Sequence, residues 1–238
     1  FGMGWGQGAQ HSQNLQAIFT HIPGLKVVMP TTPYDAKGLL ISSIQDNNPV
    51  IFIEHRWLHH MHGYVPREMY TVPIGKANII RNGKDVTIAS TSYMTIEALK
   101  AANALEQIGI SVEVIDIRTL KPLDDCLIID SVKKTGRLLA VDSGYYTGGF
   151  AGEIIARVSE KAFECLHTSP QRITLPDAPS PSTPALANHY YPRHLDIIQK
   201  VCQMAGKPKS QIEHLIESER SKDPQHLDIP NKDFTGPF

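Results

Sequence analysis

The chain contains little cysteine and no excess of charge of either sign. Its three cysteines, Cys126, Cys165 and Cys202, lie far apart and form no CxxC pair. This spacing disfavours a disulfide framework and predicts buried thiols in a reducing compartment. Lys and Arg number 23 against 24 Asp and Glu, a formal net charge of -1. That balance provides no basic face for a nucleic-acid partner.

Long apolar runs and a targeting segment are also missing. No stretch of the 238 residues is apolar for long enough to cross a bilayer, and no signal peptide is visible. We therefore expect no membrane partner. The expected location is the cytoplasm, or the mitochondrial matrix if the source is eukaryotic.

Phosphate-binding loops of the common types are absent as well. Thr147-Gly148-Gly149-Phe150 contains paired glycines, but neither a GxGxxG pattern nor a Walker lysine accompanies them. We expect these glycines to permit close packing of a strand against the helix that follows.

Histidines are concentrated between His55 and His62. Several imidazoles together can hold zinc, but no cysteine lies nearby and carboxylates are sparse apart from Glu54. Arg56 and Trp57, in the same segment, are residue types that anchor protein interfaces. We therefore favour a subunit contact or an exposed loop over a metal site.

Apolar β-branched runs alternate with helical patterns along the chain, which predicts an α/β protein with three layers and mostly parallel sheets. Runs that are apolar throughout, such as Val86-Thr87-Ile88-Ala89, are typical of strands buried on both faces. The predicted strands are 26–29, 50–54, 86–91, 112–117, 137–142 and 172–175. The predicted helices are 12–22, 34–45, 94–108, 124–133, 150–165 and 193–204.

A segment interrupted by proline and glycine, 66–83, divides this pattern. Before it only two strands are predicted, which is too few for an independent domain. We predict a partial first unit at 1–65, a linker at 66–83, a complete second domain at 84–206 and an extension at 207–238 with a short amphipathic helix. Five prolines make 176–193 a stiff connector.

The most informative segment is Gly8-Ala9-Gln10-His11-Ser12-Gln13, between a glycine-rich lead-in and an amphipathic stretch. A glycine-rich turn before a helix lets the backbone approach a ligand and leaves N–H groups free at the helix start. An imidazole at that position can exchange protons near neutral pH. His11 is therefore the candidate catalytic residue.

This segment resembles the active-site histidine loop of the beta subunits of 2-oxo acid dehydrogenase first components, which are thiamine-diphosphate-dependent relatives of transketolase. Further motifs of that family follow in the same order, so the resemblance covers about 8–206. They are His21-Ile22-Pro23-Gly24, Thr32-Pro33-Tyr34-Asp35-Ala36, Asp116-Ile117-Arg118-Thr119-Leu120-Lys121-Pro122, Thr147-Gly148-Gly149-Phe150 and Pro176-Asp177-Ala178-Pro179.

The resemblance implies a specific fold. The first unit corresponds to the back half of the thiamine pyrimidine-binding domain, and the second to a complete transketolase C-terminal domain. In the family the histidine loop lies deep inside the chain, so we expect this sequence to lack the first part of a beta subunit.

The resemblance also implies a reaction and a set of site residues. The reaction is oxidative decarboxylation of a 2-oxo acid on thiamine diphosphate, with acyl transfer to a lipoyl group. His11 would lie over the thiazolium ring, and Gln10 would accompany it on the thiamine side. Ser43, Asp46 and Asn48 match positions that supply oxygens to a structural potassium ion, although the remaining ligands of that site are absent here.

The implied partners are an alpha subunit, a second beta subunit in a heterotetramer, and the lipoyl acyltransferase core. The alpha subunit would hold most of the thiamine diphosphate with its Mg²⁺, since no GDG-type motif is present. We expect this polypeptide alone to have little or no turnover. A non-catalytic assembly or binding module, and another transketolase-like enzyme, are the alternatives. The sequence leaves the identity of the 2-oxo acid open.

Overall fold

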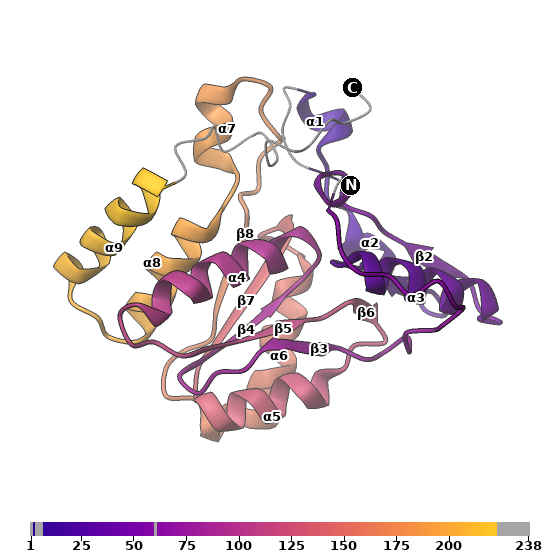
Figure 1. Cartoon of the computed structure of the whole chain (residues 1–238), viewed down its shortest axis with the longest axis horizontal. Helices are drawn as coiled ribbons and strands as arrows, with labels where there is room; N and C mark the ends of the chain where they lie inside the picture. The colour runs from indigo at the N-terminus through magenta and orange to yellow at the C-terminus, as the bar shows by residue number, and fades with distance from the viewer. Residues whose placement is uncertain (1, 3–6, 60, 223–238) are drawn as a thin grey trace.

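The computed structural model describes residues 2, 7–59 and 61–222, and its strands form two sheets (Figure 1). The larger sheet has five strands in the order β3-β5-β4-β7-β8. These are β3 (Asn78–Arg81), β4 (Val86–Ser90), β5 (Val112–Asp116), β7 (Leu138–Tyr145) and β8 (Gln171–Leu175). All pairings are parallel except that of β3 with β5. Every residue of β4 and β5 is buried, as expected for parallel strands covered on both faces.

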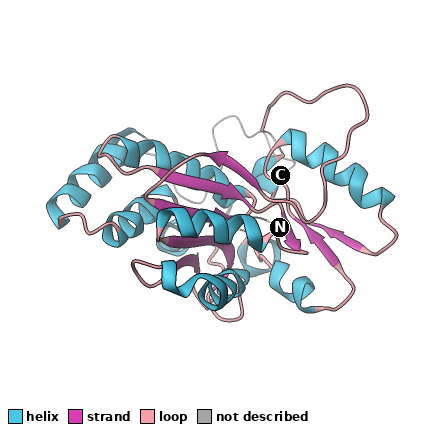
Figure 2. Cartoon of the chain, turned by 90° about the horizontal axis from the view of Figure 1, so that it is seen from below, coloured by secondary structure: helices cyan, strands magenta, loops and turns pink. Residues whose placement is uncertain are grey.

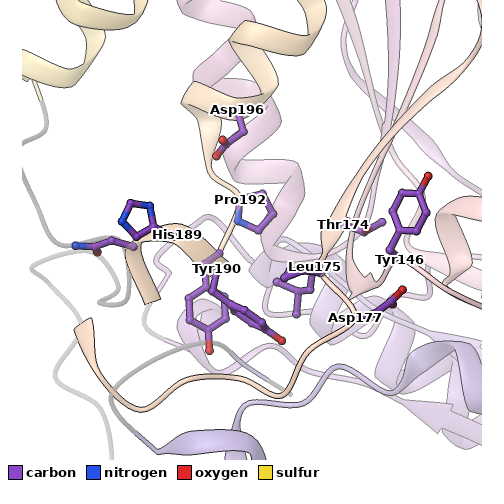
Figure 3. Close-up of a pocket in the computed structure, with 11 residues that line it drawn as sticks. Tyr146, Thr174, Leu175, Asp177, His189, Tyr190, Pro192 and Asp196 are labelled. Carbon is purple, nitrogen blue, oxygen red and sulfur yellow. The ribbon is translucent and has the colours of Figure 1, made fainter. Parts of the chain in front are cut away.

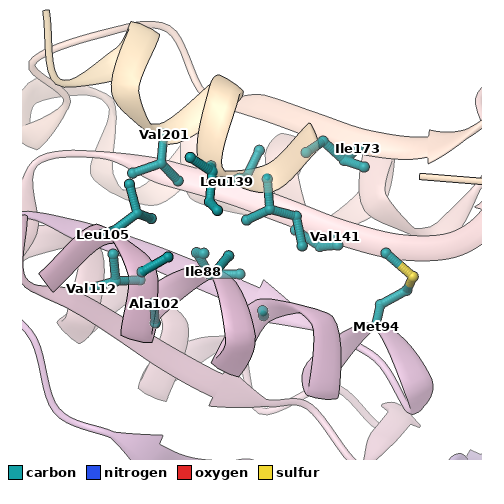
Figure 4. Packing of buried hydrophobic residues seen from close by; sticks show 14 of the residues in the cluster. Ile88, Met94, Ala102, Leu105, Val112, Leu139, Val141, Ile173 and Val201 are labelled. Atoms are coloured by element: carbon teal, nitrogen blue, oxygen red, sulfur yellow. The ribbon is translucent and has the colours of Figure 1, made fainter. Parts of the chain in front are cut away.

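Helices cover both faces of this sheet (Figures 1 and 2). Helices α4 (Tyr93–Glu106) and α8 (His194–Met204) pack together on one face, and α5 (Asp125–Thr135) and α6 (Phe150–Ala162) on the other. Figure 4 shows the first interface, where Ile88 and Val141 of the sheet meet Leu105 of α4 and Val201 of α8. Burial of each such side chain contributes about 1.5–3 kcal/mol to folding. The predicted three-layer α/β architecture is confirmed.

The smaller sheet has the order β2-β1-β6 and joins the two halves of the chain. Strands β1 (Lys26–Val28) and β2 (Val50–Phe52) are parallel, and β6 (Thr119–Lys121) is antiparallel to β1. The guanidinium of Arg118, just before β6, donates to Asp35 of α3 (Pro33–Gln45) at 2.8 Å. Both side chains of this pair are largely buried, so the first unit is held against the second.

Three predicted features differ in the structure. Strand β3 lies inside 66–83, the segment predicted to be a linker. The sequence does not reveal this strand because its apolar alternation is weak, and none of its residues is fully buried. Helix α7 (Pro184–Tyr190) lies inside the predicted connector 176–193, since Thr183 accepts a hydrogen bond from the backbone of Leu186 and Pro184 follows at the first helical position.

The third difference concerns the predicted helix 12–22, of which only Gln16–His21 is helical (α2), while a separate short helix, α1 (Gly8–His11), precedes it. The carbonyl of Ser12 accepts a hydrogen bond from the Ser180 hydroxyl at 3.1 Å. Ser180 lies far along the chain. In a continuous helix the Ser12 carbonyl would instead accept a hydrogen bond from a backbone N–H of the same helix.

The remaining elements are short 3₁₀ turns and one further helix. The turns are η1 (Arg56–Leu58) and η2 (Phe163–Cys165). Helix α9 (Lys209–Lys222) packs on α8 through Ile212 and Leu215, in agreement with the amphipathic helix predicted in the extension. Among the described helices, none has the length and apolar character required to span a bilayer.

Candidate active site

His11 is the last residue of α1, and its side chain is exposed, as is that of Gln10. Helix α1 begins at Gly8, whose φ is +65°. A Cβ at Gly8 would also lie 2.9 Å from the hydroxyl oxygen of Ser182, so only glycine fits here. The glycine turn therefore lets α1 lie against the connector before α7 and leaves the His11 imidazole facing outward.

Arg56 binds both ends of α1. Its guanidinium donates to Oε1 of Gln7 at 2.6 Å and to the backbone carbonyl of His11 at 2.9 Å. Burial lowers the pKa of Arg56, but the group stays charged at neutral pH. From the sequence, Arg56 is expected at a subunit contact or in an exposed loop, and nothing in its neighbours points to His11.

The chain after His11 is held by the second domain. Ser180 donates to the Ser12 carbonyl, and the Gln16 side-chain amide donates to the Asp142 carboxylate of β7 at 2.8 Å. Thr91 donates to the same Asp142 oxygen at 2.9 Å. Burial raises the pKa of the Asp142 carboxyl. Asp142 was not predicted as part of the site, because nothing in its local sequence connects it with residue 16.

The start of the segment after β2 is part of the core, so its interpretation as an exposed loop is wrong for His55 and Trp57. Trp57 is only 4% exposed and packs edge-on against Tyr93 of α4, with ring centroids 5.0 Å apart. His55 is fully buried and stacks on the same tyrosine. Burial lowers the pKa of His55 well below its usual value, so this imidazole is neutral.

The burial of His55 is not shared by His59 and His62 of the same segment. His59 and His62 are exposed, and His60 lies outside the described residues. Across the described part of the chain, no group of three or more His, Cys, Asp or Glu side chains is placed to hold a metal ion.

The residues predicted for potassium make contacts within the chain. Asp46 forms an ion pair with Lys26, and its other oxygen accepts from the backbone and the side chain of Asn48 at 2.9 and 3.0 Å. The hydrogen bond from Lys26 lowers the pKa of Asp46 to about 2. The Ser43 hydroxyl donates to the Leu39 carbonyl at 2.7 Å. Both carboxylate oxygens of Asp46 therefore have partners within the chain, and the ammonium group of Lys26 occupies the place that a potassium ion would take.

Two cavities are lined by described residues that do not include His11. One, of about 580 Å³, is bordered by Tyr146, Asp177, His189 and Tyr190 beside α7 (Figure 3). The other, of about 690 Å³, lies between α2, the start of α6 and Arg172.

The fold and the exposed histidine loop define a transketolase-like protein. Residues 75–197 match the transketolase C-terminal domain family and residues 1–60 match the transketolase pyrimidine-binding domain family. The chain therefore belongs to the transketolase family.

Similar proteins with curated names are beta subunits. The chain is 48% identical over 191 residues to the acetoin:2,6-dichlorophenolindophenol oxidoreductase subunit beta of Cupriavidus necator, covering 80% of this chain and 56% of that protein. It is 43% identical over 208 residues to the Bacillus subtilis protein of that name, covering 87% and 61%. To the pyruvate dehydrogenase E1 component subunit beta of Bacillus subtilis it is 43% identical over 190 residues, covering 79% and 58%. The resemblance to beta subunits of 2-oxo acid dehydrogenase first components is confirmed.

A solved structure supports the same fold. A split gene transketolase, described as an inactive beta4 tetramer, superimposes with a TM-score of 0.71 at 25% sequence identity, covering 83% of this chain and 63% of that one. The three curated relatives named above are longer than this chain, which spans 56%, 61% and 58% of their lengths.

Proposed function

We propose that this chain is a beta-type subunit of a thiamine-diphosphate-dependent dehydrogenase and supplies the His11 side of its active site. The observation that carries the proposal is the exposed His11 imidazole on a helix bound by residues of both halves of the chain. Sequence identities of 43–48% to acetoin and pyruvate dehydrogenase beta subunits support it.

His11 is the residue to which we assign proton transfer. Thiamine diphosphate, when bound, supplies a nucleophilic carbon that adds to a carbonyl and then stores the electrons released. His11 would hold or donate a proton at the substrate's carbonyl oxygen as charge develops there. Gln10, exposed beside it, would face the same ligand.

The metal and the diphosphate are assigned to another polypeptide. The described residues offer no cluster of metal ligands, so we propose that an alpha subunit holds Mg²⁺ and the diphosphate. A heterotetramer containing a second copy of this chain, and docking to a lipoyl acyltransferase core, are part of the same proposal. The resemblance implies potassium at Ser43, Asp46 and Asn48, and the ion would bind there only by displacing Lys26 from Asp46.

The substrate proposed is a small carbonyl compound that yields an acyl group. Relatives named for acetoin and relatives named for pyruvate show similar identity to this chain. Both compounds contain an acetyl group, whose carbonyl carbon is the atom that the cofactor would attack. We propose transfer of that acyl group to a lipoyl group, with pyruvate, acetoin and branched 2-oxo acids as the substrates to compare. A cytoplasmic location is proposed as well, in keeping with three free cysteines.

The test is to compare the chain alone with the chain mixed with a candidate alpha subunit, thiamine diphosphate and Mg²⁺. Size-exclusion chromatography should show a complex that contains both polypeptides. Turnover of any of the three substrates by the chain alone would contradict the proposal. Elution of the two polypeptides as separate species, with and without cofactor, would contradict it too.

A further inference from the structure

Helix α1 contains only four residues, Gly8–His11, and none of them is buried. No side chain of the described residues caps its N-terminus. A single helical turn is unfavourable by itself, because many backbone angles are fixed for very few hydrogen bonds. The conformation of α1 therefore depends on contacts from outside the helix.

Arg56 supplies such contacts at both ends of α1. One guanidinium nitrogen donates to the Gln7 side chain, which precedes the helix, and the other donates to the carbonyl of His11, which ends it. The two acceptors are separated by the whole length of α1. One planar group thus fixes the helix in position and in orientation.

The backbone that carries Arg56 is itself fixed. Trp57, the next residue, packs edge-on against both His55 and Tyr93, and its backbone N–H donates to Nδ1 of His55 at 3.2 Å. On the other side, Gly2 lies so close that a Cβ there would be 2.9 Å from Nε of Arg56. The guanidinium is therefore held between a rigid core segment and the start of the chain.

We propose that Arg56 is the positioning residue of His11: it acts on the reaction by holding α1 so that the imidazole faces the bound ligand. This inference rests on the proposed function of His11. Lysine does not reproduce this arrangement, because its ammonium group is a single nitrogen and lacks the planar fork that presents one nitrogen to each acceptor. A displacement of about 1 Å at a catalytic group costs on the order of 100-fold in rate.

The first arm of the experiment is amide hydrogen exchange on the 238-residue chain, which needs no activity. Arg56→Lys should speed exchange in 8–12 by about tenfold or more, and Gln7→Ala, which removes one of the two contacts, by a smaller factor. Exchange in the fully buried strands β4 and β5 should not change, which shows that the variants fold. The matched control is Arg81→Lys, since Arg81 also binds two side chains, those of Asn103 and Glu106. Unchanged exchange in 8–12 for Arg56→Lys would overturn the proposal.

The second arm measures kinetics in the heteromeric enzyme. Arg56→Lys should lower kcat roughly 10- to 100-fold with little change in KM. In a His11→Ala background the same substitution should have almost no further effect, because the group it positions is gone. An equal loss of kcat in both backgrounds would overturn the proposal. If His11→Ala alone left kcat unchanged, the proposed function would fail, while the exchange arm would still decide whether Arg56 holds α1.

Discussion

The side-chain amide of Gln16 donates to the carboxylate of Asp142 at 2.8 Å and thereby joins helix α2 to strand β7 of the five-stranded sheet. Both residues are completely buried. A buried carboxylate that loses a donor retains its desolvation cost, so this contact matters more than an exposed one. The loop that carries His11 is tied to the second domain through this pair.

Gln16→Leu tests the pair. The substitution keeps the size of the side chain but leaves Asp142 with one donor fewer, so we expect the free energy of unfolding to fall by about 1–3 kcal/mol. Chemical denaturation followed by circular dichroism measures it. Thr20→Val is the control, because it removes a hydrogen bond to Ala17 within the same helix and should cost within about 0.5 kcal/mol. Equal losses for both variants would refute this role of Asp142.

Asp116 should make the chain less stable as pH rises. Burial raises the pKa of its carboxyl to about 7, and the nearby Asp35 carboxylate adds to the shift. A carboxyl whose pKa is higher in the folded state stabilises that state below its ordinary pKa and loses the contribution as pH rises through about 7. Relative to Asp116→Asn, the wild-type chain should lose on the order of 3 kcal/mol between about pH 5 and about pH 8. A difference that does not depend on pH would contradict the assignment.

Glu97 should show the opposite dependence. Burial alone would raise its pKa, but the Arg193 guanidinium and a hydrogen bond with His194 lower the pKa below its usual range. The contribution of Glu97 to stability is therefore present above its ordinary pKa of about 4.5 and lost as pH falls. Glu97→Gln should destabilise the chain by about 3 kcal/mol near pH 7 and by less near pH 4. Glu106→Gln, which removes an exposed partner of Arg81, should have little effect at either pH.

Potassium should not stabilise the wild-type chain more than sodium does. Lys26 already pairs with Asp46, and Asn48 donates to the second carboxylate oxygen. Thermal unfolding in KCl and in NaCl at equal ionic strength should give the same Tm. A higher Tm in KCl would mean that the ion displaces Lys26, as the family resemblance implies.

The sequence predicts most of the larger sheet because its strands are continuous apolar runs bounded by turn residues. The same reasoning misses β6, whose three residues pair with β1 far back in the chain. It also misses α1 and begins the next helix at residue 12, four residues before α2, since Ser12 is held by Ser180, 168 positions further along the chain. Such contacts arise from tertiary structure and leave no local pattern.

The candidate site, too, is only partly predictable from the sequence, because some of its contacts join residues far apart in the chain. His11 is found from its motif, because the residues of a histidine loop are consecutive. Arg56, 45 positions away, has neighbours that suit either an interface or a core. Only the packing of Trp57 against Tyr93 shows that the segment faces inward and directs the guanidinium to α1.

The most direct test of the account is the rate of the heteromeric enzyme with His11→Ala in this chain. We expect the complex to assemble normally and turnover to fall by about 10²–10⁴-fold, as for the loss of a general acid or base. His21→Ala, which changes an exposed histidine at the end of α2, should leave the rate within a small factor of wild type. An unchanged rate with His11→Ala would remove this residue from the reaction and contradict the central claim.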